Sequence, residues 1–405
     1  MTQSVCILGR QPALGMAELE SLFGAKALQP IGQLGALLDV EPGDVDFSRL
    51  GGSLKLCKLL TYLPGTELPA IIKYISDTLP KHFDYIPAGK IHLGLSFYGF
   101  GFNAGKINAA ALSLKKNLKS SQRGMRMVPN KQPELNAAQV IHNQLTGRNG
   151  MELVLIKWGK RTVLAQTVDI QDIDAYAARD QARPKRDARV GMLPPKLAQI
   201  IINLAVNGSS SFGSRDSSQT ANSEQRAAIL DPFCGTGVVL QEALLMGFDA
   251  YGTDIEERMI DYSRENLDWL ATKHMLDKRT YLLEAGDATS FDWQDFDAIA
   301  CETYLGRPFS AMPSPDVIDE VMRDVDLIHK KFLKNVARQT KPGLRMCLAV
   351  PAWKTKSGFK HLKTLDSLEE MGYTRQGFVH ASNDNLVYHR ENQIVARELV
   401  TLIRK

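Results

Sequence analysis

The feature that most constrains the fold of this 405-residue chain is a short apolar run that leads through two closely spaced glycines into a second apolar run. The first run, residues 227–230, is followed by Asp231, then by Gly235 and Gly237, and residues 238–246 are apolar except for Gln241 and Glu242. This order predicts a strand, a tight turn and a helix. Glycines in such a turn let the backbone approach a ligand closely, and the first N–H groups of the helix attract negative charge. Turns of this kind also exist for packing alone, so the residues that follow decide its role.

Two further acids occur where the next two strands are expected to end. Asp254 follows the run 249–253, and Asp287 follows the run 281–283 after Gly286. An acid at the end of the second strand can accept hydrogen bonds from the 2′- and 3′-hydroxyls of a ribose, and one after the third strand can accept from an adenine amino group. Each acid alone also fits a helix cap or a solvated loop. Together with Asp231 they predict a nucleoside site.

The turn itself points to a particular class of enzyme. Leu240 stands where the dinucleotide fingerprint has its third glycine, so a nicotinamide cofactor fits less well. The sequence DPFCGTG over residues 231–237 is similar to the turn of methyltransferases that modify exocyclic amino groups, particularly in RNA, and this part of the chain resembles a class I S-adenosylmethionine-dependent methyltransferase. The resemblance implies an α/β fold with a seven-stranded, mostly parallel sheet and S-adenosylmethionine as the cofactor. It also implies cofactor contacts from Asp231, Pro232, Cys234, Gly235, Gly237, Asp254, Ile255, Asp287 and Ala288.

The expected catalytic loop departs from the pattern of these enzymes. After the run 297–300 they carry D/N-P-P-Y/F, whereas this chain has Cys301, Glu302, Thr303 and Tyr304. In the family, a carboxylate or amide accepts hydrogen bonds from the target amino group and the aromatic ring stacks on the flipped base. The resemblance therefore predicts Glu302 as the acceptor, Tyr304 as the stacking residue and Thr303 in place of a proline. Cys301 is expected to be a small buried residue rather than a nucleophile, because no assisting cysteine accompanies it.

The most distinctive stretch is rich in arginine and precedes the glycine turn. Residues 179–204 follow the pattern R-D-x-x-R-P-x-R-D-x-x-x-G-M-L-P-P-K-L-A-Q-x-x-x-N-L, which closely resembles the tRNA guanine-N2-methyltransferases that modify guanosine 10. Its two consecutive prolines can open an apolar helix. A linker with paired charges is the plainer interpretation. The resemblance implies tRNA as the partner; some relatives also need a small activating subunit, and the sequence leaves that open here.

A basic segment lies further upstream. Residues 101–162 contain eleven lysines and arginines but only two acids, Glu134 and Glu152, although the net charge of the whole chain is +4. Such an excess is typical of a protein that binds a phosphate backbone, and a solvated basic helix face is the alternative. The expected order of strand, basic helix, strand, helix and hairpin over residues 91–168 resembles a THUMP domain, an RNA-binding module. The candidate RNA contacts are Lys115, Lys116, Lys119, Arg123, Arg126, Arg183 and Arg186.

These patterns predict four parts of the chain: a small α/β module at 1–60, a THUMP-like RNA-binding domain with α+β structure at 61–170, a linker at 171–190 and a methyltransferase domain at 191–405 with a flexible insertion at 207–226. Segments 50–63 and 68–78 are expected to be helical or mixed, 362–371 to be a helix, and 377–381, 386–389 and 393–403 to be terminal strands. Five scattered cysteines without a C-x-x-C pair and the lack of an 18-residue apolar run favour the cytosol. The histidines have no metal-ligand spacing.

The leading hypothesis is an enzyme that transfers a methyl group from S-adenosylmethionine to N2 of a guanosine in tRNA, at position 10. Two alternatives stay open. One is a catalytically weak or inactive protein that binds the cofactor and tRNA, which the altered loop at 301–303 motivates. The other is an amino-methyltransferase that acts on another RNA or on DNA.

Overall fold

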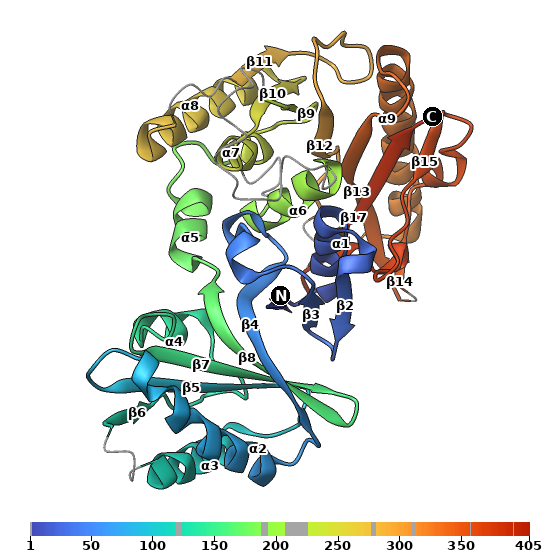
Figure 1. Ribbon diagram of the computed structural model, residues 1–405. Coiled ribbons are helices and arrows are strands. Elements are labelled where there is room, and N and C mark those ends of the chain that lie inside the picture. The colour runs from blue at the N-terminus through green and yellow to red at the C-terminus, as the bar shows by residue number, and fades with distance from the viewer. Residues whose placement is uncertain are drawn as a thin grey trace. The chain divides into compact units, whose positions relative to one another are not determined.

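The computed structural model of the chain describes residues 2–118, 123–187, 193–206, 226–276, 281–309, 313–356, 358–391 and 393–405 (Figure 1). Nearly all of the predicted insertion at 207–226 lies outside these residues, as do Lys119 and residues 188–192 of the arginine-rich stretch. The chain divides into two compact units. The N-terminal unit comprises Met1–Pro12, Ala25–Ser48 and Ser53–Ile173, and the C-terminal unit comprises Ala13–Gly24, Arg49–Gly52 and Asp174–Lys405.

The N-terminal unit is built on one eight-stranded sheet with the strand order β2-β3-β1-β4-β8-β7-β5-β6. Its strands are β1 (Ser4–Leu8), β2 (Leu28–Ile31), β3 (Gly35–Leu38), β4 (Ser53–Pro64), β5 (Ile91–Tyr98), β6 (Met125–Met127), β7 (Gly150–Trp158) and β8 (Arg161–Ile170). The pairs β7·β5 and β5·β6 are parallel and the other pairs are antiparallel. The hairpin that the sequence predicts around Gly159 is therefore confirmed as β7 and β8.

The prediction of helical or mixed structure for residues 50–63 was wrong, because most of this segment is the twelve-residue strand β4. Its apolar residues do not alternate cleanly, so the sequence shows no strand period. The strand forms because both of its edges are occupied: Cys57 lies opposite Val5 of β1 on one side and Thr167 of β8 on the other. Tertiary pairing has overridden a weak local pattern.

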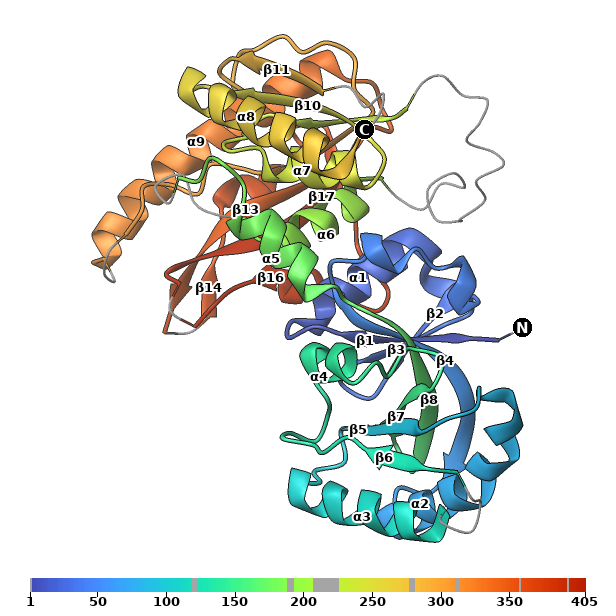
Figure 2. The ribbon, with the colours of Figure 1, turned by 90° about the vertical axis from the view of Figure 1, so that its left-hand side faces the viewer.

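Helices cover both faces of this sheet. Helices α2 (Leu68–Thr78) and α3 (Ala104–Asn117) pack on one face over the largest apolar cluster of the unit, and the short α4 (Ala137–His142) lies on the other face (Figure 2). Residues 68–78, expected to be helical or mixed, form the helix α2, and Asn136 begins α4 in a capping box with Gln139.

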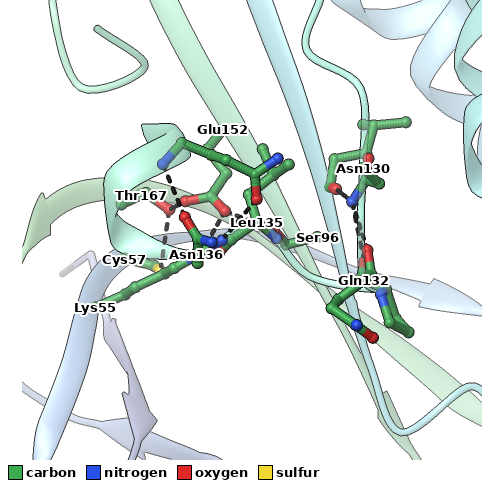
Figure 3. Close-up of polar contacts among 12 residues, drawn as sticks. Lys55, Cys57, Ser96, Asn130, Gln132, Leu135, Asn136, Glu152 and Thr167 are labelled. Carbon is green, nitrogen blue, oxygen red and sulfur yellow. Dashed lines mark hydrogen bonds and ion pairs between the residues drawn. The ribbon is translucent and has the colours of Figure 1, made fainter. Parts of the chain in front are cut away.

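A buried polar cluster joins four strands of the sheet (Figure 3). Glu152 of β7 is fully buried, forms an ion pair with Lys55 of β4, and accepts hydrogen bonds from Ser96 Oγ of β5 at 2.5 Å and Thr167 Oγ1 of β8 at 2.6 Å. Lys55 Nζ also donates to the carbonyl of Leu135 at 2.8 Å. One of the two acids of the basic segment is therefore neutralised inside the sheet.

The C-terminal unit contains a second, mixed sheet whose main path has the order β11-β10-β9-β12-β13-β17-β15. Its strands are β9 (Ala228–Asp231), β10 (Asp249–Asp254), β11 (Tyr281–Ala285), β12 (Ala298–Glu302), β13 (Arg345–Thr355), β14 (Gly358–Lys360), β15 (Tyr373–Arg375), β16 (Val387–Tyr388) and β17 (Val395–Arg404). Strands β9 to β13 run parallel, β17 runs antiparallel between β13 and β15, and the short β14 and β16 attach to β13 and β17. The predicted α/β fold with a mostly parallel seven-stranded sheet is confirmed along this main path.

Helices sandwich the second sheet. Helices α7 (Val238–Leu245) and α8 (Glu257–His274) share an apolar cluster with β10, and the long α9 (Pro315–Gln339) packs on β12 and β13 (Figure 2). Helix α6 (Pro195–Val206), which the double proline predicts, packs on α7, β12 and β13. The short helix α5 (Ile173–Gln181) precedes it. Among the helices of the described residues, none has both the length and the apolar character needed to cross a bilayer.

Helix α1 (Pro12–Phe23) belongs, from Ala13 on, to the C-terminal unit although the strands beside it in sequence belong to the other unit. Its buried Glu18 accepts from the N–H groups of Gly51 and Gly52 and from the Asn203 amide of α6, at 2.8 to 2.9 Å. Burial raises the pKa of Glu18 to about 7, and these donors limit the rise. Residues 1–60 thus supply strands to one unit and a helix to the other, while the predicted domain boundaries stay predictions.

Two local predictions near the end of the chain were wrong. Residues 362–371 form a short 3₁₀ turn, Lys363–Ser367, instead of an α-helix, and 377–381 is not a strand. The Asp326 carboxylate of α9 accepts from both the N–H and the hydroxyl of Thr364, at 2.6 and 2.7 Å, so a tertiary contact stabilises the tighter turn. The last predicted strand is confirmed as β17.

Candidate active site at the carboxyl edge of the C-terminal sheet

Three predicted site residues stand at the carboxyl ends of adjacent parallel strands. Asp231 ends β9, Asp254 ends β10 and Glu302 ends β12. Strand β9 pairs with β10 on one side and with β12 on the other, so the chain order reverses beside β9. In open α/β sheets ligands bind at such a reversal, outside the carboxyl ends of the strands. The sheet therefore brings the three acids to the edge where a ligand is expected.

The glycine turn is held in shape by contacts with α8 and with Asp254. Gly235 and Gly237 have φ values of 51° and 81°. The Gly235 N–H donates to Asp254 Oδ2 at 2.9 Å, and Ser263 Oγ of α8 donates to the Gly235 carbonyl at 2.8 Å. A Cβ atom at Gly237 would lie 2.9 Å from Ser263 Oγ. Glycine is therefore required at 237 both by the left-handed backbone and by the packing.

Substitution of Gly237 by alanine is expected to lower the free energy of unfolding by about 2 to 4 kcal/mol, since a left-handed backbone costs about 1 to 2 kcal/mol and the contact with Ser263 adds overpacking. Gly247→Ala is the matched control, because Gly247 has a φ of 94° but a Cβ atom there would have no other atom within 4 Å. Chemical denaturation of both variants measures the difference. Equal destabilisation of the two variants would show that the packing against Ser263 contributes nothing.

Asp254 and its neighbours fit an adenosine group. The Asp254 carboxylate accepts from the backbone N–H groups of Gly235 at 2.9 Å and Glu256 at 3.0 Å, and a carboxylate has about four lone-pair sites, so it can accept further hydrogen bonds from a ribose. Burial raises the pKa of Asp254 above its usual value. The adjacent Ile255 is 71% exposed and offers an apolar surface to a base. Acceptors beside an apolar surface are what a nucleoside requires.

The remaining predicted cofactor residues differ in their exposure. Asp287 is exposed and accepts from Thr289 N–H at 2.9 Å, whereas the neighbouring Ala288 is buried. Cys234 is buried in the turn, and burial raises the pKa of its thiol well above the usual range. Burial likewise raises the pKa of Asp231, and the charges of Asp254 and Glu302 raise it further. Asp254 and Glu302 therefore lie close enough to Asp231 for their charges to raise its pKa.

Thr303 holds the predicted catalytic loop to the rest of the unit. It is buried, its N–H donates to the Ala349 carbonyl at 3.1 Å, and its hydroxyl lies 2.7 Å from His329 Nε2 of α9. His329 Nδ1 donates to the Val325 carbonyl at 2.8 Å, so Nε2 is the acceptor for the Thr303 hydroxyl. Burial lowers the pKa of His329 to about 4, which keeps the imidazole neutral. Thr303, which replaces the proline of the family pattern, therefore contacts α9 of its own unit.

Glu302 carries a partner that the sequence did not reveal. Its side chain is 14% exposed and forms an ion pair with Arg397 of β17, whose side chain is 5% exposed. Burial raises the pKa of Glu302, and the charge and hydrogen bond of Arg397 lower it. Arg397 lies 95 positions further along the chain in an ordinary strand, so no local pattern marks it. Tyr304, by contrast, is 43% exposed and accessible to a substrate.

The candidate RNA contacts differ in their exposure and in their hydrogen-bond partners. Lys116, Arg126 and Arg186 are exposed and Lys115 is half-buried. Arg123 donates to the carbonyls of Phe83, Ile86 and Pro87 at 2.6 to 3.2 Å, so its guanidinium already binds the backbone of its own unit. Arg183 is only 4% exposed, and its Nε and one Nη have no hydrogen-bond partner among the described residues. RNA binding by these residues stays a prediction.

Sequence comparison finds a known domain in the C-terminal unit. Residues 223–393 match the model of a family described as "Methyltransferase domain". The chain is also 34% identical over 118 residues to the tRNA (guanine(10)-N2)-dimethyltransferase of Pyrococcus abyssi, and 41% identical over 90 residues to the protein of the same name from Methanothermobacter thermautotrophicus. These matches cover 28% and 22% of this chain, and 29% and 22% of the relatives. The chain therefore matches less than a third of the length of these curated relatives.

Two solved structures share the fold over almost the whole chain. TrmN from Thermus thermophilus superposes with a TM-score of 0.51 and 15% identity, covering all of both chains. SMU.472, a putative methyltransferase solved with S-adenosylhomocysteine, superposes with a TM-score of 0.50 and 11% identity, covering 99% of this chain and 97% of the other. Residues 223–393 therefore match a methyltransferase domain, and the strand order and the acids at the strand ends agree with the class I fold.

Proposed function

We propose that this protein transfers a methyl group from S-adenosylmethionine to the exocyclic N2 amine of a guanosine in tRNA, at position 10. The observation that carries the proposal is the pair Glu302 and Tyr304 at the carboxyl end of β12, beside Asp231 and Asp254. The similarity to archaeal proteins named as tRNA (guanine(10)-N2)-dimethyltransferases supports the choice of substrate. The basic segment of the N-terminal unit supports binding to RNA phosphates.

The residues of the site have distinct roles in this proposal. Asp254 accepts from the ribose hydroxyls and Asp287 accepts from the adenine amino group. The cofactor, when bound, supplies an electrophilic methyl group. Glu302 accepts a hydrogen bond from the guanine amino group, which favours localisation of the nitrogen lone pair, and it receives the proton that the alkylated nitrogen loses. Tyr304 stacks on the flipped base.

A second candidate function is binding of cofactor and tRNA without methyl transfer. Two observations favour it: the Glu302 carboxylate is already paired with Arg397, and Thr303 replaces the proline of related loops. Under this candidate the ion pair is purely structural. The two candidates differ in turnover alone, so an assay of methyl transfer separates them.

The test is incubation of the protein with labelled S-adenosylmethionine and unmodified tRNA transcripts, followed by nucleoside analysis. N2-methylguanosine or N2,N2-dimethylguanosine is the expected product, and a transcript with adenosine at position 10 is expected to accept no label. Label in that control transcript would show that the methylated nucleotide is not guanosine 10. Binding of tRNA and S-adenosylhomocysteine without transfer would favour the second candidate, and preferred methylation of duplex DNA would contradict both.

Substitution of Asp254 by alanine is expected to weaken S-adenosylhomocysteine binding by about 100-fold or more, because two hydrogen bonds to a carboxylate are lost at about 1.5 kcal/mol or more each. Isothermal titration calorimetry measures the change. Asp261→Ala is the control, since Asp261 is an exposed residue of α8 whose side chain pairs with Arg264. An affinity of the Asp254 variant within about twofold of wild type would remove the ribose contact from the proposal.

A further inference from the structure

We propose that Arg397 is a positioning residue for methyl transfer: it holds the Glu302 carboxylate through one oxygen and leaves the second oxygen for the target amino group. This inference rests on the proposed function of Glu302. Arg397 itself contacts neither the substrate nor the cofactor in the proposal and acts through Glu302.

The sheet register brings the two side chains together across one intervening strand. Glu302 of β12 lies opposite Ala349 of β13, and Arg397 of β17 lies opposite Pro351 of the same strand. Residues two apart on a strand share a face, and paired residues of neighbouring strands point to the same side. All four residues therefore lie on one face of the sheet, and the short Ala349 side chain leaves room for the guanidinium to reach Glu302.

The contact uses one atom of each group. Arg397 Nε donates to Glu302 Oε1. Among the described residues this is the sole hydrogen bond to the carboxylate, so Oε2 keeps its lone pairs for another donor. A carboxylate whose rotation is blocked through one oxygen presents the other in a fixed direction, which is the geometry that an amino group requires for in-line transfer.

The same contact favours the charged form of Glu302. Among the described residues, Arg397 is the cation that interacts with Glu302, while Asp231 of β9 and Cys301 of its own strand are the acidic groups whose pKa values the Glu302 charge raises. Burial opposes ionisation of Glu302, whereas the charge and hydrogen bond of Arg397 favour it. Removal of the guanidinium charge therefore raises the pKa of Glu302, and the carboxylate is lost at a higher pH than in the wild type.

The acid that follows Arg397 in β17 does not pair with it. Glu398 is buried and points to the opposite face, where it pairs with Arg375 and His361. Arg375 is therefore a matched control: it is a second arginine paired with a buried glutamate of the same unit, but it does not contact Glu302.

The experiment compares Arg397→Met and Arg397→Gln with Arg375→Met in the full-length protein. Steady-state methyl transfer to unmodified tRNA gives kcat, KM and their pH dependence, calorimetry gives the affinity for S-adenosylhomocysteine, and thermal unfolding reports folding. For both Arg397 variants we expect kcat to fall by about 10- to 100-fold, with the cofactor affinity and the KM for tRNA within about threefold of wild type. The acid limb of the kcat profile is expected to move to higher pH, because the unpaired carboxylate is protonated more readily. Arg375→Met is expected to leave that limb unmoved.

Arg397→Gln keeps a hydrogen-bond donor without the charge, so it provides a folded variant if the methionine variant is unstable. A folded Arg397→Gln protein with the wild-type kcat and pH profile would overturn the proposal. A shift of the acid limb in Arg375→Met as large as in the Arg397 variants would also overturn it, because the effect would then belong to any buried arginine of this region. Wild-type protein that binds tRNA and cofactor but transfers no methyl group would instead overturn the proposed function, and this inference with it.

Discussion

Substitution of Glu302 by alanine is expected to lower the rate of methyl transfer to tRNA by about 100-fold or more, since a positioned carboxylate in contact with the reacting group contributes about 10²- to 10⁴-fold. Glu302→Gln keeps an acceptor oxygen and a partner for Arg397 but lacks the charge, so its rate is expected to lie between that of the alanine variant and the wild type. Single-turnover assays with saturating cofactor measure the chemical step, and the affinity for S-adenosylhomocysteine is expected to stay within about threefold of wild type.

Removal of Glu302 also leaves the buried Arg397 without its partner, which costs about 3 to 5 kcal/mol in comparable buried pairs. Thermal unfolding must therefore accompany the assay, and the glutamine variant separates the chemistry from the stability. Glu320→Gln, an exposed acid of α9, is the control. If the folded Glu302→Gln and Glu302→Ala variants both retained more than about a third of the wild-type rate, the carboxylate would not act in methyl transfer.

Substitution of Glu152 by alanine is expected to destabilise the N-terminal unit by about 3 to 5 kcal/mol. The change leaves the Lys55 ammonium buried without a counter-ion, and Ser96 and Thr167 lose the acceptor that binds both hydroxyls. The double variant Lys55→Met, Glu152→Met is expected to be more stable than Glu152→Ala, because it removes both buried charges together. Chemical denaturation measures these differences, and hydrogen exchange of the β7 and β8 amides assigns them to this sheet.

An exposed ion pair of the same unit supplies the control for Glu152. Lys73 and Asp77 of α2 form an i,i+4 pair at the surface, so Asp77→Ala is expected to cost less than about 0.5 kcal/mol. A loss below about 1 kcal/mol for Glu152→Ala would indicate that water enters the cluster and solvates Lys55. If the double variant were less stable than Glu152→Ala, the interaction between Lys55 and Glu152 would itself stabilise the sheet.

Local patterns were sufficient to predict the elements of the proposed nucleoside site. The strand, glycine turn and helix around Gly235, the acid that ends β10 and the helix opened by the double proline are all confirmed as elements. Each depends on residues within a few positions of one another: glycine permits a left-handed backbone, proline begins a helix, and an acid follows an apolar strand. Such requirements can be recognised from residues that are close together in the sequence, without knowledge of any tertiary contact.

The tertiary structure alone decided which side chains are free to act. It pairs Glu302 with Arg397 across β13, buries Thr303 against His329, and occupies Arg123 with backbone carbonyls. It also makes a strand of β4 and assigns α1 to the C-terminal unit. The physical reason is shared: a buried charge, a buried polar group or an unpaired strand edge needs a partner from elsewhere in the fold, and the local sequence does not show which distant residue that partner is.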